Sequence, residues 1–241
     1  MLGDLEAIEN SEYNNAGALY TMSGVGEELL GALSRMNEVR RKKVINKLST
    51  PVMPSKGSRA EMEKHFSELP DHIRRELLSG GLRLADALIY SVKPVQASKT
   101  IKMFETQDVK EVGIRNVSNA KLPKNQALLV SGIVLLAGIS TDQAKDNVMS
   151  TSFKELSTFP AIVNGEFDLK ANKKVIVPET SNYVFKTANN TTIPFGYYKL
   201  SNPRLILDDI QIELTINLGT IVGLDPNTQL FVGLHGTITT P

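Results

Sequence analysis

The side chains best able to do chemistry in this sequence are a run of cations, three histidines and some scattered carboxylates. Residues 35–47 hold six Lys or Arg against one Glu, and the cations include Arg40, Arg41, Lys42, Lys43 and Lys47. Clustered cations bind nucleic acid through its phosphates, because each contact releases condensed counterions and needs no base readout. The alternative is a solvated helix face, since Arg40, Lys43 and Lys47 recur at three- and four-residue spacing. No aromatic residue interrupts the run, so stacking on single-stranded bases is not expected.

A second pattern, of Glu and His, invites a metal-site interpretation. Helical spacing can bring such side chains to one face, and the residues concerned are Glu61, His65, Glu68, His72 and Glu76. However, Pro70 lies between them and is expected to redirect the chain, and no second cluster accompanies them. We therefore expect a charged surface helix here, and neither a metal site nor a cofactor.

The remaining polar residues do not predict an active site. The chain has no Cys and only three His. Asp208-Asp209, with Glu213 and Asp225, lacks the spacing of an acid–base pair or a calcium loop, and we assign it to a turn. His235 lies between two glycines in an apolar stretch, and no Gly-x-Ser-x-Gly motif accompanies it, so we expect a structural histidine. We expect no enzyme activity and no small-molecule substrate.

The elements that would position these residues differ between the two parts of the chain. Residues 1–95 are expected to be a helical N-terminal region, because apolar residues recur at helical spacing from Gly24 to Leu48 and from Ile73 to Ile89. Between these stretches, a helix is expected to start near Ser58 and to be interrupted at Pro70. Gly80-Gly81 weakens the last helix and could separate two short ones.

Residues 100–241 are expected to form an antiparallel β-sandwich or jelly roll of about eight strands, which makes the whole protein mainly β. The clearest strand is Ile210–Leu218, where Ile and Leu alternate strictly with polar residues and predict one buried face. The other predicted strands are Ile101–Phe104, Glu111–Val117, Ala127–Ala137, Lys174–Val177, Tyr183–Lys186, Arg204–Leu207 and Leu230–Ile238. No helices of 10–15 residues separate them, which disfavours a parallel α/β sheet. Residues 141–159 are expected to be a long loop with a short helix near Asp142–Val148.

Charge and hydropathy add limits on partners. The net charge is +1, so no overall field attracts nucleic acid or an anionic membrane. The longest apolar stretch, Ala127–Ile139, is too short for the roughly 20 residues of a membrane-spanning helix. The acidic start of the chain lacks the features of a secretory signal. We expect no transmembrane segment and folding in an aqueous compartment.

Three stretches carry a resemblance to a known family. Residues 104–117 are typical of a strand, a turn and a second strand; Ile210–Leu218 and Leu230–Ile238 are typical of a closing antiparallel pair around the turn at 223–227; and the chain stops at Pro241 directly after a strand. In this pattern of strands and turns the β half resembles the jelly-roll capsid proteins of icosahedral tailless viruses, particularly bacteriophages. The resemblance supplies no catalytic residues.

The resemblance implies a virion structural protein that is made in the host cytoplasm and assembles with copies of itself and other virion proteins. The helical N-terminal region would contact neighbouring subunits or, through Arg40–Lys43, the genomic nucleic acid. The alternative is a β-sandwich recognition module, such as the receptor- or glycan-binding domain of a fibre or surface protein. A cupin-type enzyme is disfavoured, because a cupin metal site needs several histidines and only His235 lies in the β half.

Overall fold

The computed structural model of the protein describes residues 58–187 and 194–241. Lys56–Pro241 forms one compact unit, and every described residue belongs to it. Two short α-helices and a 3-10 turn open this part: α5 (Ser58–Lys64), η1 (Phe66–Glu68) and α6 (Asp71–Ser79). The predicted helix start near Ser58 and the interruption at Pro70 are both confirmed, and Pro70 is the N-cap residue of α6.

The helix predicted from Ile73 to Ile89 is wrong in its second half. α6 ends at Gly80, whose φ of 79° is a left-handed conformation that glycine adopts readily, and strand β1 (Arg83–Pro94) follows. The two glycines thus separate a helix from a strand and not two helices. Both faces of β1 are partly covered, with Leu84 packed against the helices and Ile89 in the main core. A strand covered on both faces loses the alternation by which a sequence reveals a strand.

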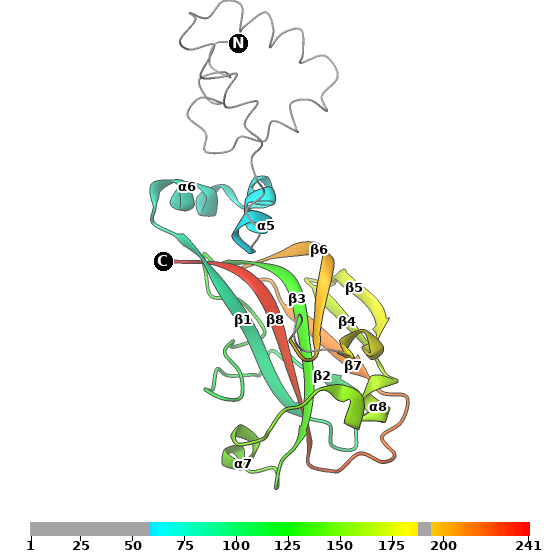
Figure 1. The fold of residues 1–241 in the computed structure, drawn as a ribbon. Helices are drawn as coiled ribbons and strands as arrows, with labels where there is room; N and C mark the ends of the chain where they lie inside the picture. The colour runs from blue at the N-terminus through cyan, green and yellow to red at the C-terminus, as the bar shows by residue number, and fades with distance from the viewer. Residues whose placement is uncertain (1–57, 188–193) are drawn as a thin grey trace, which may run out of the picture. The chain divides into compact units, whose positions relative to one another are not determined.

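The structure confirms a mainly β protein with eight antiparallel strands in two sheets (Figure 1). After β1 the strands are β2 (Thr100–Lys102), β3 (Ala127–Ile139), β4 (Glu166–Ala171), β5 (Lys174–Ser181), β6 (Tyr197–Leu207), β7 (Ile212–Asn217) and β8 (Thr228–Thr240). One sheet has the order β1-β8-β3-β6, and the other has the order β2-β7-β4-β5.

The strands pair from the two ends of the β region inward. β1 pairs with β8, β2 with β7, β3 with β6, and β4 with β5. Two further pairs, β3 with β8 and β4 with β7, join these ribbons into the two sheets. The longest pairing is that of β1 with β8, which runs without a register shift from Arg83 opposite Thr240 to Pro94 opposite Gln229.

The main core lies between the two sheets and contains inward-facing residues of both. In β7 the predicted alternation is confirmed, since Ile212, Leu214 and Ile216 are buried while the polar residues between them are partly exposed. Leu128, Ile133 and Leu135 of the central strand β3 are also buried and belong to the same cluster.

Six of the eight predicted strands overlap observed ones, and two are wrong. Glu111–Val117 is a turn region in which Glu111 and Arg115 form an isolated bridge. Tyr183–Lys186 falls mainly in the 3-10 helix η3 (Asn182–Phe185). Strand β4 was not predicted.

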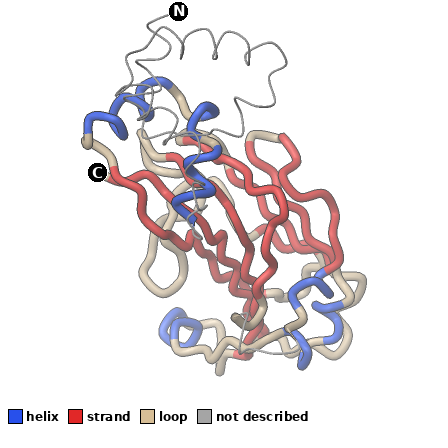
Figure 2. The backbone as a smooth tube through the Cα atoms, turned by 45° about the horizontal axis from the view of Figure 1, so that its top comes forward, coloured by secondary structure: helices blue, strands red, loops and turns tan. Residues whose placement is uncertain are grey.

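Short helices lie at both ends of the strands (Figure 2). α5 and α6 pack on the outer face of the β1-β8-β3-β6 sheet through a cluster that includes Met62, Ile73 and Leu129. Between β3 and β4 the chain forms α7 (Lys145–Met149), η2 (Leu156–Thr158) and α8 (Pro160–Val163), which agrees with the predicted loop and short helix. None of the helices in the described residues is long and apolar enough to cross a membrane.

Candidate interaction surfaces

The five cations singled out in the sequence, Arg40, Arg41, Lys42, Lys43 and Lys47, lie outside the described residues. Their contact with nucleic acid stays a prediction.

The Glu and His residues between 61 and 76 are distributed over α5, η1 and α6. His65 Nδ1 lies 2.9 Å from Glu68 Oε1, whereas His72 is exposed on α6. Among the described residues, no group of three or more His, Asp or Glu side chains is placed to hold a metal ion. Asp208 and Asp209 form the turn between β6 and β7, as expected, and Asp208 Oδ2 accepts a hydrogen bond from the Asn125 backbone N–H at 2.7 Å.

His235 lies on the outer face of the β1-β8-β3-β6 sheet beside Ser131 and Tyr197. Its Nδ1 is 3.4 Å from Ser131 Oγ, and the Tyr197 ring stands edge-on to the imidazole, with ring centroids 5.7 Å apart. Burial raises the pKa of the Tyr197 phenol, and the negative charge of Glu61 adds to the shift, while a hydrogen bond with Ser131 opposes it.

The free edge of strand β1 is covered by the connection between β2 and β3. Asn116 acts as a substitute strand residue, because its side-chain oxygen accepts the Tyr90 N–H at 2.8 Å and its amide donates to the Leu88 carbonyl at 2.7 Å. The Val92 N–H donates to the Ile114 carbonyl at 2.8 Å. These contacts occupy backbone groups that could otherwise pair with another strand.

The other sheet edges are also poor templates for strand pairing. β6 contains Pro203, which has no N–H to donate, and its pairing with β3 shifts register between Val130 and Gly132. β5 contains Pro178 and two register shifts against β4. β2 is only three residues long. Association of this unit through its strand edges is therefore disfavoured.

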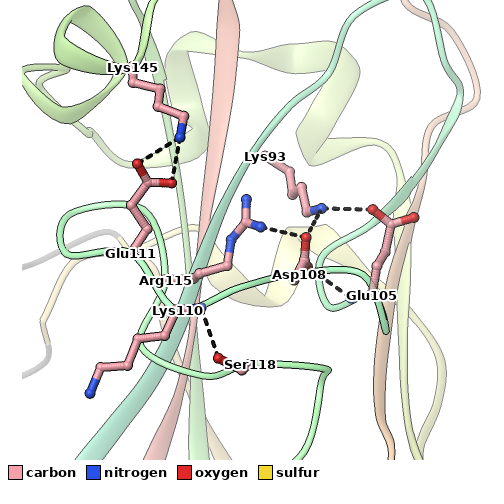
Figure 3. A network of polar contacts seen from close by, with 8 residues as sticks. All are labelled: Lys93, Glu105, Asp108, Lys110, Glu111, Arg115, Ser118 and Lys145. Atoms are coloured by element: carbon pink, nitrogen blue, oxygen red, sulfur yellow. Dashed lines mark hydrogen bonds and ion pairs between the residues drawn. The ribbon is translucent and has the colours of Figure 1, made fainter.

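A buried ion network fixes the connection that covers β1 (Figure 3). Asp108, 4% exposed, accepts hydrogen bonds from Lys93 Nζ at 2.7 Å and from an Arg115 guanidinium N–H at 2.5 Å. Lys93 Nζ also donates to Glu105 at 2.7 Å. Because Lys93 belongs to β1 and the other three residues to the β2–β3 connection, the network ties that connection to the sheet.

Exposed apolar side chains occur on this connection and on α7, which the Lys145–Glu111 ion pair joins. Val109 and Val112 are 69% and 83% exposed, and Met149 of α7 is 42% exposed. Met149 lies against the connection at Gly113, the residue after Val112, since a Cβ built at Gly113 would lie 3.0 Å from the Met149 side chain. Exposed apolar patches commonly mark contacts with other proteins.

The outer faces of the two sheets differ in polarity. On the β1-β8-β3-β6 sheet, the face between the two groups of helices carries half-buried apolar side chains such as Val134, Leu136 and Tyr197. On the β2-β7-β4-β5 sheet most outward residues are polar or charged and include Lys102, Glu213, Thr215 and Lys170. Val175 of β5, opposite Lys170, is an exposed apolar exception, and Asp168 is buried beside Lys170. Lys170 Nζ lies 2.9 Å from Asp168 Oδ2, and this contact raises the pKa of the Lys170 ammonium. The second face is therefore suited to water or to a polar ligand.

The polar face also carries a depression of about 290 Å³ where β2 ends and β7 continues. It is lined by Lys102, Phe104, Glu105, Thr106, Gln107, Gln211, Glu213, Leu214 and Thr215. The sequence predicted that Gln211, Glu213 and Thr215 lie on the polar face of one strand, but it gave no sign that residues 105–107 would join them.

No protein-family model matches the chain, and no curated protein matches it.

Proposed function

We propose that the β module is a jelly roll and that the chain is a virion structural protein, a capsid subunit that assembles with copies of itself. The strand pairing carries this proposal. A jelly roll is an eight-stranded double sheet in which a folded ribbon pairs strand 1 with 8, 2 with 7, 3 with 6 and 4 with 5. The observed pairs and the sheet orders β1-β8-β3-β6 and β2-β7-β4-β5 agree with that pattern.

The distribution of polar and apolar surface suggests how copies associate. Since the strand edges are covered or interrupted, contacts between subunits fall on loops and on the apolar outer face. The exposed side chains of Val109, Val112 and Met149, on the connection that covers β1 and on α7, are proposed as one such contact. The N-terminal region, with Arg40–Lys43, would contact other subunits or the genome inside the virion.

Light scattering and negative-stain microscopy of the purified full-length chain test this proposal. We expect large closed particles at micromolar concentration. A stable monomer or trimer at that concentration would contradict the capsid function.

Matched valine substitutions then test the contact surface. Val112→Asp places a charge in the proposed contact, and we expect the particle fraction to fall at least tenfold. Val175→Asp introduces the same charge at a valine, 56% exposed, on the β5 edge of the other sheet, and should leave assembly unchanged. Circular dichroism melting curves of both variants check that each remains folded. Equal assembly of the two variants would rule out the Val109–Val112–Met149 patch while leaving the capsid function intact.

A further inference from the structure

We propose that the depression between β2 and β7 binds a neutral, hydroxyl-rich ligand of monosaccharide size, and thus that this protein recognises a carbohydrate. This goes beyond assembly and does not depend on it. The volume of about 290 Å³ is near the lower limit of ligand pockets, which suits a single sugar ring better than a large cofactor.

The depression exists because β7 changes partner along one edge. β2 pairs with β7 only up to Lys102 opposite Thr215, and the Met103 N–H then donates to the Leu214 carbonyl at 2.9 Å. Farther along, Ile212 and Gln211 pair instead with residues 120–121 of the β2–β3 connection. Between Met103 and residue 120 the β2–β3 connection leaves the sheet, and the polar side of β7 is exposed there.

The rim of the depression is fixed by the buried network. The Asp108 N–H donates to the Glu105 carbonyl at 3.0 Å, and Asp108 Oδ2 accepts the Glu105 N–H at 2.9 Å. These two bonds close the turn that carries Thr106 and Gln107. Because Asp108 is itself held by Lys93 and Arg115, the rim is ordered before a ligand arrives, which lowers the entropic cost of binding.

The lining offers hydrogen-bonding groups that the protein does not use. In the described part of the chain the side chains of Thr106, Gln107, Gln211 and Thr215 make no hydrogen bond, and all four line the depression. Their hydroxyls and amides can each donate and accept. Convergent neutral groups of this kind match the paired donor and acceptor character of sugar hydroxyls.

The charges in the depression balance, which selects against ionic ligands. Glu105 is paired with Lys93 at 2.7 Å, and the remaining two charges, those of Lys102 and Glu213, are opposite in sign. An anion such as phosphate would meet the Glu213 carboxylate, and a cation would meet the Lys102 ammonium. A neutral ligand avoids both penalties, and the Glu213 carboxylate can accept hydrogen bonds from its hydroxyls.

Saturation-transfer NMR and calorimetry on the full-length protein test the inference with glucose, galactose, mannose, N-acetylglucosamine, N-acetylneuraminate and inorganic phosphate as probes. We expect saturable binding of at least one neutral sugar with a Kd on the order of 1 mM, as few contacts in an open site allow. N-acetylneuraminate and phosphate should not bind. Absence of saturable binding by all four neutral sugars at 50-fold that concentration, or preferential binding of an anion, would overturn the inference.

Two substitutions and one control locate the binding. Gln211→Ala and Glu213→Ala remove lining groups and should each weaken sugar binding at least tenfold. Asn217→Ala changes the same face of β7 outside the depression and should leave the affinity within twofold. An equal loss in all three variants would place the sugar elsewhere. Failure to bind sugars leaves the particle assay unaffected, so this inference and the proposed function can fail separately.

Discussion

At the residue scale, Gly236 of β8 is the described glycine at which an added Cβ would meet its nearest atom at the shortest distance. A Cβ built there would lie 1.8 Å from the Leu129 carbonyl oxygen of β3, beside the register shift between Val130 and Gly132. A backbone atom of a central strand cannot move aside without disturbing the sheet. Gly236→Ala is therefore expected to lower the free energy of unfolding by about 3 kcal/mol, measured by urea denaturation followed by circular dichroism.

Gly219→Ala is the matched control, because a Cβ at that loop position meets nothing within 4 Å. Its unfolding free energy should stay within about 0.5 kcal/mol of the parent protein. If both variants unfold at the same urea concentration, the close packing at Gly236 does not limit stability.

Some individual residues could be assigned from sequence and others could not. The polar positions of β7 follow from strict alternation, which is a local property of the chain. Thr106 and Gln107 join them only because a turn held by Asp108 folds back onto β7. No local pattern encodes that contact, since it depends on ion pairs between segments that are distant in sequence.

At the scale of elements, the β2–β3 connection depends on one buried carboxylate. Asp108 is 4% exposed and joins Lys93 to Arg115. Asp108→Ala would leave the partly buried Arg115 without its carboxylate partner and Lys93 with Glu105 alone. Breaking a buried pair from one side typically costs about 3–5 kcal/mol. We expect a loss of that order in a urea titration, together with faster hydrogen exchange of the Tyr90 and Val92 amides, which the connection covers.

The exposed pair between Lys145 and Glu111 provides the comparison. Lys145 Nζ lies 2.8 Å from Glu111, but its side chain is 71% exposed, and exposed pairs typically contribute at most about 1 kcal/mol. Lys145→Ala should therefore change stability little. A cost similar to that of Asp108→Ala would show that burial does not distinguish the two pairs.

The elements themselves were predictable where one face is buried and the other meets water. β7 has that pattern and was predicted. In β4 the apolar Phe167 and Leu169 alternate in sequence with Asp168 and Lys170 before the Asn172-Lys173 turn, so the strand could have been recognised, although Asp168 is itself buried. β1 could not, because helices and the β2–β3 connection cover its outer face with apolar contacts and remove the alternation.

At the scale of the whole molecule, the topology and the surfaces have separate consequences. The nested pairing brings the first and last strands together, which no single segment of the sequence specifies. The covered and interrupted edges oppose growth of the sheets by strand addition. The two outer sheet faces differ in polarity and are therefore suited to different contacts. The apolar face and its neighbouring loops suit contact with other copies, while the polar face and its depression can remain open to a ligand.

The last prediction concerns the charge of the whole chain. The net charge of +1 gives no general attraction for nucleic acid, so any affinity must come from the local run at residues 35–47. Replacing Arg40, Arg41, Lys42 and Lys43 together by Gln should weaken retention of single- and double-stranded nucleic acid. Each lost phosphate contact lowers the slope of log K against log salt by about 0.7–0.9, so up to four contacts would lower it by about 3. Filter binding between 50 and 200 mM salt measures this slope.

Replacing Lys121, Lys124, Lys173 and Lys174 by Gln removes the same charge from exposed positions of the β module and should leave the slope unchanged. An equal decrease in both variants would mean that retention reflects total charge, and the run would then be a solvated surface and not a genome contact.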